Sequence, residues 1–200
     1  MLSHKSLSWR WSESYERCLV NPVLNGDSPF LPAQWVGEMA AELRTRGITL
    51  AGQRLLIIGP GQNPEAHYWL AAFPELAGII QVDWMADHVR AQQVLFAGEP
   101  KVQTFCSSAS DLSEIETGSI AGIFSFLSLF YLERDVRAKQ KAAAEMHRVL
   151  RVDGGQCGWA LLHVYYDFYD DGMDGFCEQE KVLFAGGLQG ARLWFRGDHS

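Results

Sequence analysis

Short apolar runs alternate with amphipathic segments along most of the chain. Four large aliphatic side chains stand in a row at residues 55–58, and such a run is typical of a strand buried on both faces of a parallel sheet. The predicted strands are Arg54–Ile58, Ala77–Val82, Val102–Cys106, Ile120–Phe126 and Gln156–Val164. The predicted helices are Gln34–Arg46, Glu65–Phe73, Ala86–Phe96 and Asp135–Leu150.

This order of elements predicts an α/β fold with a doubly wound, mostly parallel sheet of the Rossmann-like type. We expect one main domain at residues 34–200, preceded by an N-terminal helix and loop at residues 1–33 that could act as a lid. Gly175–Gly186 would add a helix and Ala191–Phe195 a sixth strand, unless Val182–Phe195 folds as a hairpin. The C-terminal edge is therefore expected to be abbreviated, and an exposed edge could pair with a second subunit in a homodimer.

Composition narrows the class of partner. The 200 residues carry a formal net charge of -7 with a pI near 5.3, which disfavours nucleic acid or an anionic membrane and favours a small molecule. The four cysteines are widely separated and form no C-x-x-C pair, so neither a zinc site nor a redox motif is expected. No apolar run is long enough to span a membrane, and we expect a reduced, cytoplasmic protein.

The segment GPGQNP after the first strand is the most informative turn. Gly59 and Gly61 allow a positive φ and a close approach of a ligand to the backbone, although a purely structural turn can carry glycine as well. Asp83 lies 22 residues after Gly61, where its carboxylate could accept hydrogen bonds from ribose hydroxyls or cap the following helix. Together they predict a site for an adenosine-type ligand. A dinucleotide fingerprint would place a third glycine at Pro64, so an NAD-dependent oxidoreductase is disfavoured.

Several segments resemble the class I S-adenosylmethionine-dependent methyltransferases, over roughly residues 55–195. LLIIGPGQN is similar to their nucleotide loop, and IIQVDWMADHVRAQQ is similar to their second strand and helix. VQTFCSSASDLSEIETGSIAGIFSFLSLFYLE resembles the adenine loop and the fourth strand, and EMHRVLRVDGGQ resembles the helix and glycine turn before the fifth strand. The resemblance implies S-adenosylmethionine as the cofactor and methyl transfer to a small-molecule acceptor.

The resemblance also implies a set of site residues. Those expected to bind the cofactor are Gly59, Pro60, Gly61, Asn63, Asp83, Trp84, Ser108, Ala109 and Phe126. A general base is needed only when the acceptor must lose a proton, and it would lie beyond the fourth or fifth strand. His163 is the first candidate, with Tyr131 and Tyr166 as polar partners that could orient the acceptor. His163 could equally be a structural residue at the end of the sheet.

Three positions depart from the family pattern. Ile57 stands where an acidic residue commonly helps to hold the methionine ammonium, and Ser108 stands where the adenine loop has an Asp, which Asp111 could replace. Ala121 stands where the fourth strand usually has the Asp of a Phe-Asp pair. These departures affect the ligand site more than the core. The alternative hypothesis is therefore a catalytically degenerate, methyltransferase-like binding or scaffold protein.

Overall fold

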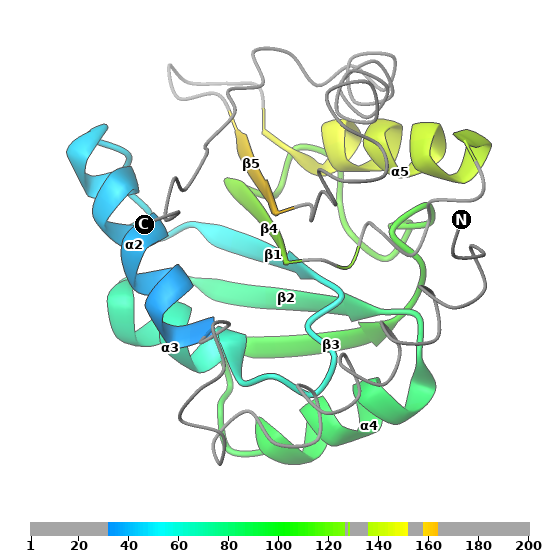
Figure 1. Cartoon of the computed structure of the whole chain (residues 1–200), viewed down its shortest axis with the longest axis horizontal. Helices are drawn as coiled ribbons and strands as arrows, with labels where there is room; N and C mark the ends of the chain where they lie inside the picture. The colour runs from blue at the N-terminus through cyan, green and yellow to red at the C-terminus, as the bar shows by residue number, and fades with distance from the viewer. Residues whose placement is uncertain (1–31, 127, 129–135, 152–157, 164–200) are drawn as a thin grey trace, which may run out of the picture.

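The computed structural model describes residues 32–126, 128, 136–151 and 158–163, which build a central parallel sheet (Figure 1). Its strands are β1 (Arg54–Ile58), β2 (Gly78–Asp83), β3 (Val102–Cys106), β4 (Gly122–Phe126) and β5 (Trp159–His163). They are hydrogen-bonded in the order β3-β2-β1-β4-β5, and every neighbouring pair is parallel. The chain moves outward from β1 to β3 and then returns to place β4 on the other side of β1. The switch point, where ligands bind in such sheets, therefore lies between β1 and β4.

Four helices surround the sheet in the described part of the chain: α2 (Pro32–Thr45), α3 (Glu65–Ala72), α4 (Ala86–Leu95) and α5 (Val136–Val149). None of them is long and apolar enough to cross a membrane. The end of α2 is capped by a glycine. Gly47 has a φ of 69°, and the N–H of Ile48 donates to the carbonyl of Leu43 at 2.9 Å, which is the pattern of a Schellman motif.

Side chains of β1 alternate between two hydrophobic clusters, one on each face of the sheet. Leu55 and Ile57 lie in a cluster with residues of α2 and α3, including the fully buried Trp69. Leu56 and Ile58 lie in the other cluster, with residues of α5. Because both faces of β1 are covered, its uninterrupted apolar run has a direct structural cause. The predicted doubly wound α/β fold is confirmed.

The predicted and observed strands differ most at the starts of β4 and β5, and β5 begins at Trp159 rather than at Gln156. Strand β4 begins at Gly122 rather than at Ile120, which instead forms an isolated bridge with Leu150. At Gly122 a Cβ atom would lie 2.2 Å from the ring of Trp159 on β5. The absence of a side chain at Gly122 therefore lets the indole of Trp159 cross the start of β4.

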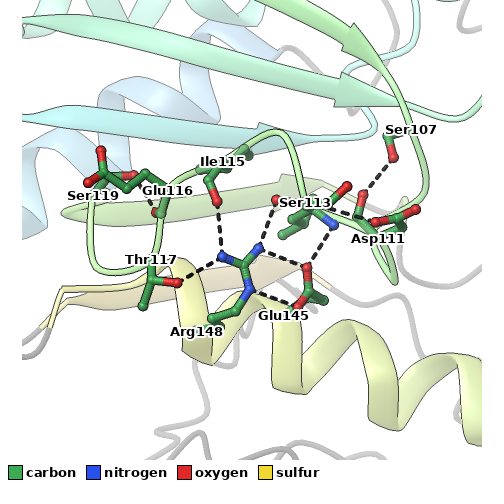
Figure 2. Close-up of polar contacts among 10 residues, drawn as sticks. Ser107, Asp111, Ser113, Ile115, Glu116, Thr117, Ser119, Glu145 and Arg148 are labelled. Atoms are coloured by element: carbon green, nitrogen blue, oxygen red, sulfur yellow. Dashed lines mark hydrogen bonds and ion pairs between the residues drawn. The ribbon is translucent and has the colours of Figure 1, made fainter.

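The connection from β3 to β4 contains no helix and is held by two residues of α5 (Figure 2). The guanidinium of Arg148 donates to the carbonyls of Leu112 and Ile115, at 2.8 and 3.0 Å, and to the hydroxyl of Thr117 at 3.1 Å. Glu145 accepts two hydrogen bonds from Arg148 and one from the N–H of Leu112. Glu145 and Arg148 belong to the EMHRVLRVDGGQ segment, which resembles the methyltransferase family. These two residues of the segment therefore have a structural role in holding the connection from β3 to β4.

Several predictions fall outside the described residues. They are the helix and lid expected at residues 1–33, of which only residues 32 and 33 are described and already belong to α2, the side chains Tyr131 and Tyr166, and the helix, strand or hairpin expected within residues 175–195. They stay predictions.

Candidate functional site

The turn after β1, residues 59–64, is called the glycine turn below. Hydrogen bonds to β2 and from Ser128, which follows β4, hold its start in place. Gly59 and Gly61 adopt φ values of 67° and 59°. The N–H of Gly59 donates to the carbonyl of Val82 at 2.7 Å, and Ser128 donates its hydroxyl to the carbonyl of Ile58 at 2.7 Å. A Cβ atom at Gly59 would lie 2.1 Å from the Cβ of Ser128. Both the positive φ and this contact require glycine at position 59.

Asp83 ends β2 and is 4% exposed, so its carboxylate is shielded from bulk water. The carboxylate faces the glycine turn. Its Oδ2 accepts the N–H of Gly61 at 3.0 Å, and its Oδ1 accepts the N–H of Met85 at 2.9 Å. The Nδ1 of His88 lies 3.3 Å from Oδ2. A carboxylate offers about four acceptor positions. Asp83 therefore braces the turn and still has capacity for a hydroxyl group, with a second position available if His88 turns away.

Gln92 is a residue of this site that the sequence reasoning missed. It lies on α4, is fully buried, and donates its amide Nε2 to the carbonyls of Gly61 and Asn63, each at 2.8 Å. Its place in the sequence could have indicated it, because Gln92 is a polar residue three positions after Val89 and therefore lies on the inner face of α4. Gln92 holds the far side of the glycine turn, opposite to Asp83.

Substitution of Gln92 by methionine is expected to destabilise the protein by about 1–2 kcal/mol, because two carbonyl groups at the turn lose their donor. Since the turn would be less well ordered, affinity for an adenosyl ligand should fall about five-fold. Urea unfolding and titration calorimetry would measure the two effects. The exposed neighbour Gln93 provides the matched control, and its change to methionine should alter neither quantity. Equal behaviour of the two variants would mean that Gln92 does not support the turn.

Trp84 follows Asp83 and is 68% exposed, an unusual position for a large aromatic side chain. At the end of β3, the N–H of Ser107 donates to the carbonyl of Asp83 at 3.0 Å, so the two strand ends are joined. Ser108 makes a hydrogen bond to Ser110 within its own loop, and Ala109 is buried in the second core cluster. The exposed indole is therefore available to a ligand, Ser108 is half-buried, and Ala109 is buried in the core.

Phe126 and His163 end β4 and β5 and are register partners. The sheet thus brings their backbones to the same edge as the glycine turn and Asp83. Tyr131 and Tyr166, the other two residues expected near an acceptor, lie outside the described residues. Within the described ranges, no three His, Cys, Asp or Glu residues form a group that could hold a metal ion.

Position 57, where an acidic residue would be expected, is apolar in its surroundings as well. Ile57 is fully buried in the cluster beneath α3. On α3 itself, Glu65 is 2% exposed, and burial raises the pKa of its carboxyl from 4.5 to about 8. A buried carboxyl thus stands four residues after Gly61, at a position where the sequence pattern predicts only the start of a helix.

The raised pKa of Glu65 predicts how stability changes with pH. The folded state keeps this proton between pH 4.5 and about 8, whereas the unfolded state releases it, so stability falls as pH rises through this range. Glu65→Gln removes the titration. We expect this variant to melt at a higher temperature than the wild type at pH 9 and at a similar temperature at pH 5, as measured by calorimetry. A constant difference at both pH values would contradict this.

Comparison with protein-family models gives a match to a methyltransferase domain over residues 56–157. Comparison with curated proteins gives no match. The chain spans about half the length of the first solved structures that it matches, from 42% to 60%.

Three solved structures share the fold at low sequence identity. A Methanococcus maripaludis protein, described as an S-adenosyl-L-methionine-dependent methyltransferase, has 18% identity and a TM-score of 0.53, with 69% of this chain and 60% of that chain covered. Aeropyrum pernix fibrillarin, with natively bound S-adenosyl-L-methionine, has 15% identity and a TM-score of 0.54, covering 76% and 65%. A complex of the Haloferax volcanii Trm112 methyltransferase activator with a methyltransferase gives 11% identity and a TM-score of 0.55, covering 80% and 77%.

The family match includes β1 from Leu56 onward, the glycine turn, Asp83 and the Glu145–Arg148 pair. It covers more than half of the chain, and the strand order is that of a doubly wound sheet with its switch point at the turn. The chain therefore belongs to the class I S-adenosylmethionine-dependent methyltransferase family.

Proposed function

We propose that the protein transfers a methyl group from S-adenosylmethionine to a small-molecule acceptor. The observation that carries the proposal is the braced glycine turn at the switch point, faced by the carboxylate of Asp83. The exposed indole of Trp84 stands next to it. A carboxylate for the ribose and an aromatic surface beside it suit an adenosyl group.

S-adenosylmethionine supplies a methyl group on a sulfonium, from which a neutral thioether leaves. The protein's part in such a displacement is to align the reactants and exclude water. In the proposed site Gly61 allows close approach of the ligand, Asp83 binds the ribose, and Trp84 flanks the adenine. Gly59 shapes the turn, because the space that its side chain would fill is occupied by Ser128. Pro60, Asn63, Ser108, Ala109 and Phe126 would line the remainder of the cofactor site.

The acceptor would lie beyond the ends of β4 and β5, next to the proposed cofactor site. If the acceptor must lose a proton, we propose His163 as its base, with Tyr131 and Tyr166 orienting it. The formal charge of -7 supports a small or cationic acceptor over a nucleic acid.

Ligand-dependent thermal stability tests the cofactor half of the proposal. A ligand that binds only the folded state at about 100 times its dissociation constant adds roughly 2.7 kcal/mol. S-adenosylmethionine and S-adenosylhomocysteine should raise the melting temperature, and NAD should not. The absence of a shift with all three would contradict the cofactor assignment and favour the alternative of a binding or scaffold protein.

Native mass spectrometry of the purified protein tests the acceptor half. A copurified adenosyl ligand or acceptor would be identified by its mass, and addition of S-adenosylmethionine should then add one methyl group to the acceptor. If only a bound protein or nucleic acid copurifies and is methylated, the small-molecule acceptor is wrong while the cofactor assignment stands.

A further inference from the structure

Glu65 lies at the switch point of the sheet. It begins α3 directly after the glycine turn, and Trp69, one helical turn later, has its ring 5.2 Å from that of Phe124 on β4. Residues four apart share a helix face, so Glu65 faces the sheet as Trp69 does. One helical turn advances about 5.4 Å and a strand residue about 3.3 Å. Since α3 runs back from the carboxyl edge, Glu65 overlies the ends of β1 and β4, beyond Phe124.

The carboxyl of Glu65 lacks a protein partner on one side. Its Oε2 is buried and has no hydrogen-bond partner in the described part of the chain. A buried carboxyl without a partner is costly to keep, since water would otherwise bind it. Such a group is retained more readily where a donor or a cation from a ligand can approach it.

The methionine end of the cofactor carries an ammonium group, and the usual acidic position for it is the buried Ile57. We propose that Glu65 replaces that acidic residue and binds the ammonium of the amino-acid end of the cofactor. This inference rests on the proposed function. It assigns the ammonium to α3 rather than to β1, and it removes one reason for regarding the site as degenerate.

Two other buried donors offer an alternative reason for the buried carboxyl of Glu65. Trp69 Nε1 and Gln81 Nε2 are buried and have no partner among the described residues, so an internal water could join them to the carboxyl. That arrangement would give Glu65 a structural role only. In that case substitution of Glu65 would affect a ligand without an amino-acid end as much as one with it.

Two ligands separate these roles in a calorimetric titration. S-adenosylhomocysteine carries the amino-acid end, whereas 5′-methylthioadenosine carries the adenosine and sulfur without it. Glu65→Gln should lower the affinity for S-adenosylhomocysteine about ten-fold or more, because a charged hydrogen bond is lost. Its affinity for methylthioadenosine should be unchanged. Glu75→Gln, at an exposed carboxyl, is the matched control and should affect neither ligand.

The possible failures differ from one another. Equal losses for both ligands, or no loss for either, would overturn the role of Glu65 and leave the proposed function standing. If wild-type protein binds neither ligand, the proposed function fails, and the inference fails with it.

Proton release gives a second readout that a structural role would not produce. At pH 7 a carboxyl with a pKa of about 8 is ionised in roughly one molecule in ten, so ammonium binding should expel its proton. Burial is the cause of the raised pKa of Glu65. None of the charged or titratable groups on neighbouring elements contributes to it. These groups are Glu42, Arg44, Arg46, His67, Tyr68, Asp83 and His88. Titrations in buffers of different ionisation enthalpy should detect release in the wild type and none in Glu65→Gln. Equal release in both would overturn the inference.

Discussion

Replacement of Asp83 by alanine is expected to lower the affinity for S-adenosylhomocysteine about 100-fold, which corresponds to about 2.7 kcal/mol. The carboxylate would bind the ribose hydroxyls, and it also accepts the N–H of Gly61. Loss of both interactions removes a ligand contact and loosens the turn beneath it. Removal of the acceptor from the buried N–H of Gly61 should also cost about 2 kcal/mol of stability. Titration calorimetry and urea unfolding would measure these quantities separately.

Two further variants identify which of these interactions matters. Asp83→Asn keeps an oxygen that can accept from Gly61 or from Met85 but loses the charge, so it should recover part of the stability and little of the affinity. Asp87→Ala, at an exposed carboxylate in the first turn of α4, should change neither. If Asp83→Ala loses stability but keeps its affinity, Asp83 only braces the turn and the ribose assignment is wrong.

The sheet could be predicted from sequence because its pattern depends on local burial. β1 and β3 have the predicted bounds, and β2 differs only by beginning at Gly78 and including Asp83. β1 and β2 are mostly buried, and a strand covered on both faces needs a short, mostly apolar run. β3 has no fully buried residue, but its Val, Thr and Phe side chains favour a strand. The spacing of Gly61 and Asp83 was equally informative, since parallel neighbouring strands bring their carboxyl ends to one edge.

The support around the turn could not be predicted in the same way. Gln92 reaches Gly61 across 31 residues, so this contact depends on how α4 lies against the turn. Glu65 has the sequence features of a solvated carboxylate in the first turn of a helix, where acidic residues are common. Its burial depends on how α3 lies over the sheet. The sequence pattern therefore indicates a loss at Ile57, whereas in the proposed site Glu65 takes the place of the missing acidic residue.

Arg148→Ala is expected to destabilise the protein by about 3 kcal/mol, the largest effect on stability among these variants. The guanidinium donates to Leu112, Ile115 and Thr117 of the connection between β3 and β4, and to Glu145 (Figure 2). Truncation leaves carbonyls without a donor and a partly buried carboxylate without its partner. The same connection carries Ser108 and Ala109, so cofactor affinity should fall as well. Urea unfolding measures the first effect and calorimetric titration the second.

A matched ion pair shows whether burial and loop contacts, rather than charge alone, make Arg148 important. Arg90 and Asp87 have the same spacing on α4, but their side chains are 69% and 74% exposed, against 31% and 19% for Arg148 and Glu145. Arg90→Ala should therefore cost no more than about 0.5 kcal/mol.

The hydrogen bond from Arg148 lowers the pKa of Glu145 below 4.5. This pair therefore stabilises the fold above that pH and ceases to do so as acid protonates the carboxylate. The stability difference between wild type and Arg148→Ala should narrow below pH 4.5, whereas a difference independent of pH would show that only the backbone contacts of Arg148 matter.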